Sequence, residues 1–154
     1  MNKWLFILVL LIGLNLMGCS NEGLSGGKPP KVFIEIDNER FETTLGTYCW
    51  SESRKGTCVD TAGPVELLKD KTPVKVKPGE TISFIIDYEP KPNESHVVQI
   101  SNNNENEVMI KNNSFTAPMQ SGVYYYSYGI WWIDEQEANV SHGDAFYAFV
   151  LEVN

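Results

Sequence analysis

Residues 81–88 read Thr-Ile-Ser-Phe-Ile-Ile-Asp-Tyr, and this stretch decides the fold class. Its apolar and polar side chains alternate: Ile82, Phe84 and Ile86 fall on one parity, and Ser83 and Asp87 fall on the other. Successive side chains of a strand point to opposite faces, so the alternation predicts a β-strand with one buried face. The Pro-Gly-Glu turn at residues 78–80 marks where this strand begins.

Similar short segments recur along the rest of the chain. The strand candidates are residues 32–36, 41–50, 74–77, 96–100, 107–110, 123–128 and 145–153. Turn-forming residues separate them, and no stretch after the amino-terminal segment has helical periodicity. The step from Ala117-Pro118 to Gly122, which leads into an aromatic strand, gives the order of elements an immunoglobulin-like look. We therefore expect an all-β fold, an immunoglobulin-like β-sandwich of about 7–9 antiparallel strands.

The amino terminus carries an export signal. Lys3 precedes an unbroken apolar run over residues 4–14, which is too short to span a bilayer. The segment ends Leu16-Met17-Gly18-Cys19 and resembles the lipobox of bacterial lipoproteins. The resemblance implies cleavage before Cys19 and fatty acyl chains such as palmitate on that residue. The alternative is an ordinary signal peptide that is cut nearby, with Cys19 as a bystander.

These features predict three parts of the chain. Residues 1–18 form the lipoprotein signal peptide, and residues 31–154 form the β-sandwich domain. Between them, residues 19–30 comprise the lipidated Cys19 and a segment rich in Gly, Ser and Pro. This segment has nothing to bury, so we expect a flexible tether that stands the domain off the membrane.

The charge of the chain bears on its partners. The formal net charge is −8 at pH 7, and removing Lys3 with the signal makes the mature chain more acidic. An acidic protein repels phosphate backbones, so nucleic acid is a poor partner. It also repels anionic lipid, so the membrane link is expected to be the lipid anchor rather than a basic patch.

Cys49 and Cys58 remain once Cys19 is assigned to the lipid. An even pair in an exported protein predicts a disulfide that closes a short loop. A free redox pair and a soft-metal site are the alternatives, although the spacing is not Cys-x-x-Cys and no histidine lies near in sequence.

Few residues are candidates for catalysis or metal binding. His142-Gly143-Asp144 could supply a base, but no nucleophile motif accompanies it, and we expect a turn before the last strand. The acidic run at residues 134–137 lacks the spacing of a calcium loop, so we expect a solvated loop. We therefore predict no catalytic residue, no metal site and no cofactor.

Aromatic residues offer the best candidates for ligand binding. Tyr124, Tyr126, Tyr128 and Trp132 share one parity of a predicted strand, while Trp131 lies on the other. One set must face the core, and an exposed set, with Trp50 as a further candidate, could bind sugar rings or a peptide. In the alternative, Trp131 and Trp132 leave the strand and cap the core with Trp50. A tyrosine of this strand is also a candidate for a tyrosine corner.

Several of these motifs occur together: the lipobox, the tether, Tyr48-Cys49-Trp50 with a nearby Cys58, the Pro-Gly-Glu strand and the Tyr-x-Tyr strand. Together they resemble small lipoproteins of Bacillus-type Gram-positive bacteria. The resemblance implies an extracytoplasmic, membrane-attached β-sandwich and supplies no catalytic residues.

Three functions remain open from the sequence. The first is a binding module displayed on the cell membrane, with an envelope protein or a cell-wall glycan as partner. The second is a thiol-redox or other enzyme that uses Cys49 and Cys58, or His142 and Asp144. The third is a passive accessory subunit of an envelope sensor or transporter.

Overall fold

A computed structural model describes residues 23–53, 55–102, 104–137 and 140–154, and these residues are mostly β-strand. In chain order the elements are β1 (Val32–Ile36), β2 (Glu39–Glu42), β3 (Thr44–Glu52), β4 (Lys55–Val59), α2 (Pro64–Leu67), β5 (Val74–Val76), β6 (Thr81–Ile86), β7 (Glu94–Ser101), β8 (Asn104–Val108), β9 (Ser114–Thr116), β10 (Gly122–Ile133) and β11 (Ser141–Val153). None of the described helices is long and apolar enough to cross a membrane.

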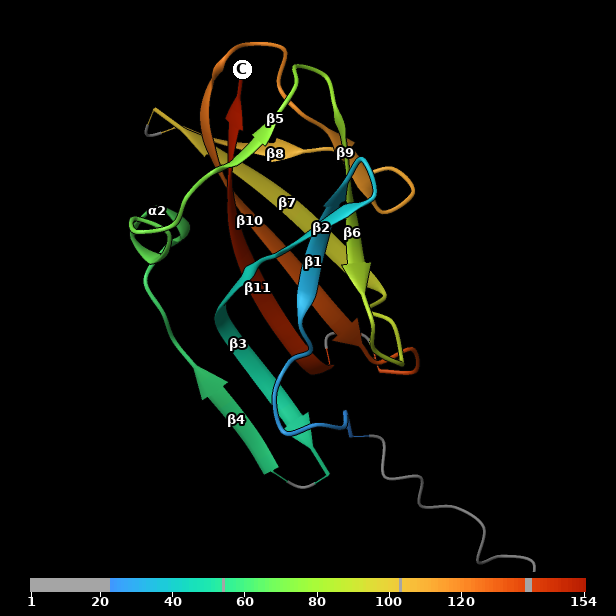
Figure 1. Ribbon diagram of the computed structural model, residues 1–154. Coiled ribbons are helices and arrows are strands. Elements are labelled where there is room, and N and C mark those ends of the chain that lie inside the picture. Colours follow the sequence, from blue (N-terminus) through green and yellow to red (C-terminus); the bar gives the residue numbers. More distant parts are fainter. Residues whose placement is uncertain (1–22, 54, 103, 138–139) are drawn as a thin grey trace, which may run out of the picture.

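The strands form two sheets that pack as a sandwich (Figure 1). The smaller sheet has the order β2-β1-β6-β9, and the larger has the order β4-β3-β11-β10-β7-β8, with β5 also pairing with β11. The run β11-β10-β7-β8 matches strands G, F, C and C′ of an immunoglobulin variable-type domain, and β1, β6 and β9 match A, B and E. The predicted immunoglobulin-like β-sandwich is confirmed.

Two details differ from the expected strand set. The described residues form more strands than predicted, because the strand predicted at residues 41–50 is divided into β2 and β3 and because β4 and β9 are additional. One pairing is also parallel, since β5 runs alongside the end of β11 from Val74 against Leu151 to Val76 against Val153. All other strand pairs in the described residues are antiparallel, as expected.

The core lies between the two sheets and is built from alternate residues of each strand. In β6, the side chains of Ile82, Phe84 and Ile86 are all buried, which confirms the alternation in the sequence. The Phe84 ring stacks on Tyr128 of the facing sheet, with 3.7 Å between ring centroids and an interplanar angle of 7°. Burial of large aromatic rings on both inner faces holds the sandwich together by the hydrophobic effect.

The turn predicted at His142-Gly143-Asp144 is wrong. These residues belong to β11, which begins at Ser141 and pairs with β10 along almost its whole length. Gly143 pairs with Trp132 and is buried. Leu24 and Trp50 lie so close to it that any side chain at this position would collide with them. The need for a residue without a side chain explains a glycine inside this strand.

The tether predicted over residues 19–30 is already packed on the domain from Leu24 onward. Leu24 is only 5% exposed and belongs to the main core cluster. Pro29 is also buried, and the Tyr147 hydroxyl donates a 2.7 Å hydrogen bond to the Pro30 carbonyl. The expectation that this segment has nothing to bury is therefore wrong. Cys19 and the predicted signal peptide lie outside the described residues.

Candidate binding site on the outer face of the larger sheet

Most of the aromatic residues proposed from the sequence as a binding face lie in the core. Trp50, Tyr126, Tyr128 and Trp132 are each at most 3% exposed. Tyr126, Tyr128 and Trp132 point inward because β10 keeps its alternation as far as Ile133 instead of ending before the tryptophans, and Trp50 enters the same core from β3. These four residues therefore cannot contact a ligand, and their assignment to a binding face is wrong.

Tyr124 has the geometry of a tyrosine corner, for which the sequence offers any tyrosine of this strand. It stands near the start of β10, which is the F-strand equivalent, and packs partly buried at the edge of the core. Its hydroxyl donates a 3.0 Å hydrogen bond to the Gln120 carbonyl in the preceding connection. This geometry is structural and ties the loop to the strand.

Trp131 alone among the proposed aromatics lies on the outer face of the larger sheet. Its ring packs edge-on against Phe146 of β11 at 5.4 Å and against His96 of β7 at 5.5 Å between centroids. Both Trp131 and Phe146 lean over Gly129, where an added Cβ would come within 2.6 Å of the Trp131 ring. Gly129 thus lets two aromatic rings lie close to the sheet.

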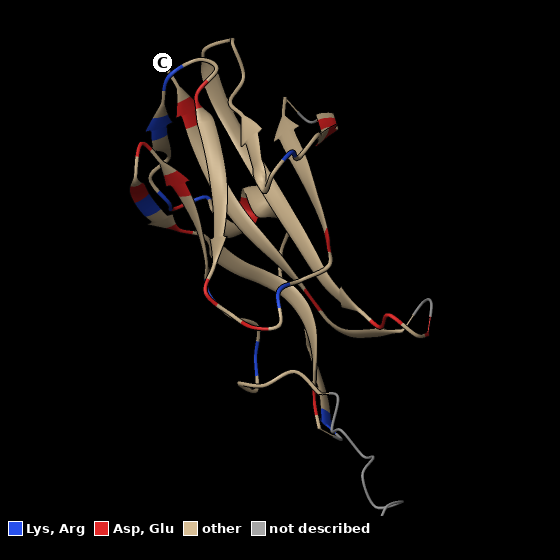
Figure 2. Ribbon diagram, turned by 90° about the vertical axis from the view of Figure 1, so that its right-hand side faces the viewer, with Lys and Arg blue, Asp and Glu red and all other residues tan. Residues whose placement is uncertain are grey.

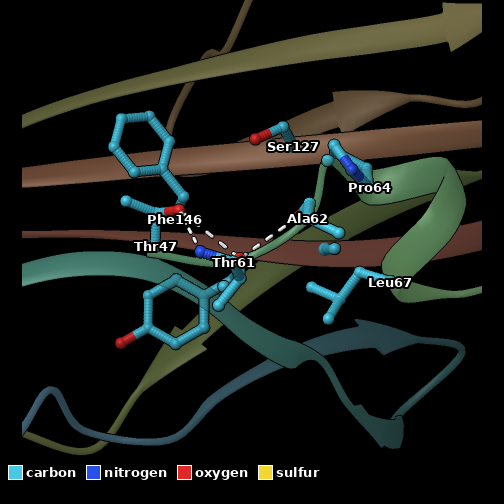
Figure 3. Close-up of a pocket in the computed structure, with 11 residues that line it drawn as sticks. Thr47, Thr61, Ala62, Pro64, Leu67, Ser127 and Phe146 are labelled. Atoms are coloured by element: carbon cyan, nitrogen blue, oxygen red, sulfur yellow. Dashed lines mark hydrogen bonds between the residues drawn. The ribbon is translucent and has the colours of Figure 1, made fainter. Parts of the chain in front are cut away.

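A hollow opens on the same face beside Phe146 (Figure 3). We call it the outer-face hollow; its volume is about 310 Å³. It lies over β10, β11 and β3 and is bordered by the chain that leads into α2. Its lining includes Gly46, Thr47, Thr61, Ala62, Leu67, Ser127, Phe146 and Ala148.

An irregularity in β3 creates the space for this hollow. Tyr48 pairs with Ala145 and Leu45 pairs with Tyr147, so two residues of β3, Gly46 and Thr47, stand opposite the single residue Phe146. Such a bulge redirects side chains locally. An added Cβ at Gly46 would lie 3.2 Å from the Phe146 carbonyl oxygen, so glycine keeps this wall open.

The lining of the outer-face hollow is mainly apolar, with a few hydroxyl groups and no charged side chain. Thr47 and Thr61 lie on one side of it: the Thr61 backbone N–H donates to the Thr47 hydroxyl at 3.1 Å, and the Thr61 hydroxyl donates to the Ala62 carbonyl at 3.1 Å. Next to the hollow, Leu67 and Leu68 cover Ala148 and the adjoining part of the sheet. The arrangement suits an uncharged ligand with both apolar and hydroxyl surface.

His96 borders the aromatic pair on its other side and is held between two carboxylates. One ring nitrogen lies 3.1 Å from Glu94 and the other lies 3.1 Å from Glu107. Hydrogen bonds to Glu94 first, and then to Glu107, raise the pKa of His96 above its ordinary value of 6.5. The outer face therefore gains positive charge beside Trp131 as the pH falls.

Cys49 and Cys58 form a disulfide, as predicted. They stand directly opposite each other in the β3–β4 hairpin, with 4.1 Å between their Cα atoms. Cys49 also pairs with Asp144 of β11, and its backbone N–H donates to the Asp144 carboxylate. Burial raises the pKa of Asp144, and that hydrogen bond opposes the rise.

The structure pairs His142 with Asp134 rather than with Asp144. His142 Nε2 lies 3.0 Å from Asp134 Oδ2. The other carboxylate oxygen of Asp134 accepts hydrogen bonds from the Glu137 and Gln136 backbone N–H groups, and these hold the pKa of Asp134 below its usual range. Both oxygens of Asp134 therefore have partners within the protein, whereas residues 135–137 are exposed, in agreement with the predicted solvated loop.

Within the described residues, no group of three or more His, Cys, Asp or Glu side chains is arranged to hold a metal ion. The chain has no significant match among models of protein families, curated proteins or solved structures. The structure therefore characterises this protein by two features. One is an immunoglobulin-like sandwich, and the other is a hollow, bordered by aromatic residues, on the outer face of its larger sheet.

Proposed function

We propose that this chain is a membrane-anchored, extracytoplasmic lipoprotein whose β-sandwich is a binding module for a cell-wall glycan. The lipobox-like segment that ends in Cys19 supports the anchor. The single observation that supports the binding role is the outer-face hollow, with Phe146 at its border and Trp131 packed beside Phe146.

The chemistry of the hollow favours a saccharide. A sugar ring has apolar C–H faces that pack on aromatic rings, and its hydroxyls hydrogen-bond to short polar groups. The hollow offers Phe146 and Leu67 on the apolar side and the hydroxyls of Thr47, Thr61 and Ser127 on the polar side. Its volume of about 310 Å³ lies at the lower end of small-ligand sites, so it would hold about one ring of a longer chain.

Binding is favoured over catalysis by the surroundings of the histidines. His142 is engaged by Asp134, and the nearby Ser141 hydroxyl donates to the Gly143 carbonyl at 2.9 Å rather than to the imidazole. His96 is engaged by two carboxylates. A nucleophile aligned with a base, which acyl transfer and related chemistry need, is not formed by these groups.

Co-sedimentation with purified, insoluble peptidoglycan tests the proposal. The mature chain should sediment with the polymer, and Trp131→Ala and Ala62→Trp should each weaken binding by about tenfold or more, which corresponds to about 1.4 kcal/mol. Trp131→Ala removes an aromatic ring, whereas Ala62→Trp fills the hollow from an exposed position. Val123→Ala, on the same face of β10 but away from the hollow, is the matched control.

Circular dichroism should show that all three variants are folded. Equal sedimentation of the three variants and the wild type would contradict a glycan site in the hollow. If the wild-type chain does not bind peptidoglycan but binds an envelope protein, and Trp131→Ala abolishes that binding, the glycan proposal is wrong and the protein-binding alternative is supported.

A further inference from the structure

The amino-terminal segment is fixed to one end of the sandwich by a buried side chain. The Leu24 side chain is packed in the main core cluster, and its backbone N–H donates a 3.0 Å hydrogen bond to the Ser51 carbonyl. It rests on Trp50 and occupies the space that Gly143 leaves open, where an added Cβ would lie 2.6 Å from Leu24 Cδ1. Leu24 therefore has a shaped site of its own.

The residues after Leu24 are also held. The Ser25 backbone N–H donates to the Tyr88 hydroxyl at 2.9 Å, and that hydroxyl donates to the Ser25 carbonyl at 3.1 Å. The Gly26 N–H donates to Glu52 Oε1 at 3.3 Å. The path from Leu24 to the start of β1 is thus part of the domain rather than a spacer.

The covalent distance from the lipid site to this docked segment is short. Only residues 20–23 separate Cys19 from Leu24. In any conformation, the five steps between these two Cα atoms span at most about 18 Å. The twelve residues of β10 extend about 40 Å, so the reach is well under the length of the sandwich.

From this geometry we infer that the end of the sandwich around Leu24 faces the lipid surface and that the opposite end, with β5 and the carboxyl terminus, points away from it. The inference rests on the proposed lipid anchor at Cys19. The membrane-facing end comprises the β3–β4 hairpin tip, the connection between β6 and β7, and the loop that begins at Asp134 (Figure 1).

Charge at this end opposes direct adhesion to anionic lipid. Glu52 lies in the hairpin opposite Lys55, and Glu135 and Glu137 are exposed in the loop that follows β10, while Asp134 of that loop is bonded to His142. Figure 2 shows red segments in this loop and a blue segment next to the red one at the hairpin tip. Anionic headgroups repel these carboxylates. The covalent reach, rather than electrostatic attraction, is what holds this end near the lipid surface.

This orientation limits where the outer-face hollow can find its ligand. Ala148 of the hollow lies five residues along β11 from Gly143, which touches Leu24, and this is about 17 Å of strand. With the Leu24 side chain that separates its own Cα from Gly143 added, the hollow stays within about 45 Å of the lipid-bearing residue. Its ligand would be the part of the cell wall nearest the membrane, or chains newly exported to it.

Short-range quenching in vesicles tests the orientation. Lys55→Cys places a fluorophore at the hairpin tip, and Lys77→Cys places one just after β5 at the opposite end; both lysines are exposed. The full lipidated chain is inserted into phosphatidylglycerol–phosphatidylethanolamine vesicles that contain a nitroxide-headgroup lipid. Quenching at position 55 should exceed quenching at position 77 severalfold, and a long Gly-Ser insertion after Ser20 should abolish the difference.

The outcomes separate the inference from its premise. A chain that binds the vesicles but shows equal quenching at the two positions, or more at position 77, overturns the orientation alone. A chain that does not bind the vesicles overturns the lipid anchor and the orientation together. A difference that survives the Gly-Ser insertion also overturns the inference, because the short reach would then not be its cause.

Discussion

At the scale of single residues, Leu24 links the amino-terminal segment to the core. Its side chain is 5% exposed and lies against Trp50 at a position made available by Gly143. Truncating a buried leucine removes hydrophobic burial and leaves a cavity. Leu24→Ala should therefore lower the free energy of unfolding by about 2–4 kcal/mol, measured by urea denaturation.

Met119→Ala provides the matched control for this prediction. Met119 is an apolar residue of similar size but is 75% exposed. Its truncation should change the free energy of unfolding by less than about 0.5 kcal/mol. If Leu24→Ala were as mild as the control, the segment before β1 would not be part of the folded unit.

His96 gives a prediction about pH. Its hydrogen bonds to Glu94 and Glu107 raise its pKa above 6.5 in the folded chain. Protonated His96 therefore stabilises the fold below the unfolded-state pKa, and this contribution is lost as the pH rises through the folded-state pKa. The effect on stability should be small and sensitive to salt, because the side chain is 49% exposed.

An NMR titration of the His96 ring measures this pKa directly. Glu94→Gln should bring the pKa back toward 6.5, because the bond to Glu94 is the largest cause of the rise. Glu105→Gln, in the same strand as Glu107 but opposite Ile100, should leave it unchanged. A wild-type pKa at or below 6.5 would be at odds with the contacts described for His96.

At the scale of elements, the inserted β3–β4 hairpin is the feature that the disulfide reinforces. The bridge joins directly paired residues of two strands at one edge of the larger sheet. Closing a loop of this length should contribute about 2–3 kcal/mol by the chain-entropy argument. In the double variant Cys49→Ser/Cys58→Ser, the free energy of unfolding measured by urea denaturation should fall by about this amount. Adding a reducing agent should lower the stability of the wild type but not that of the double variant.

Thiol titration of the unfolded wild-type chain complements that experiment. Cys49 and Cys58 should react only after reduction, because both sulfurs are in the bridge. Two reactive thiols without prior reduction would favour the redox alternative for this pair. An unchanged free energy of unfolding in the double variant would show that the hairpin does not depend on the bridge.

The predictability of the elements follows from their patterning. β6 could be predicted from its sequence because its apolar and polar residues alternate, with Ile85 as the one exception. The first residues of β11 could not, because His142, Gly143 and Asp144 are common in turns and only the tertiary fit of Gly143 against Leu24 favours a strand there. Residues near 65 look like a short apolar piece, yet Pro64 at the first helical position starts one turn of helix.

The candidate site was harder to predict than the fold. The alternation of side chains along a strand correctly places Trp131 and Trp132 on opposite faces of β10. The sequence does not say which face is buried, because both faces of this strand carry aromatic residues. The sequence does not single out Phe146, because the residues around it in β11 are apolar on both faces of the strand. The hollow itself depends on the β3 bulge at Gly46, and strand register is a long-range property.

At the scale of the whole molecule, three features have separate places. One end holds the docked Leu24 and leads to Cys19, the outer face of the larger sheet carries the hollow, and the other end holds β5 and the carboxyl terminus. The proposed roles are likewise separate: attachment at one end and glycan binding on one side. The proposed location depends on lipid at Cys19, whereas the proposed ligand class depends on the lining of the hollow.

The intact mass of the chain extracted from bacterial membranes tests that central claim most directly. The account predicts a polypeptide that begins at Cys19 and carries a diacylglyceryl group, together with release of Cys19→Ala from the membrane fraction. A chain cut elsewhere with an unmodified Cys19, or a Cys19→Ala chain that stays firmly in the membrane fraction, would contradict the account.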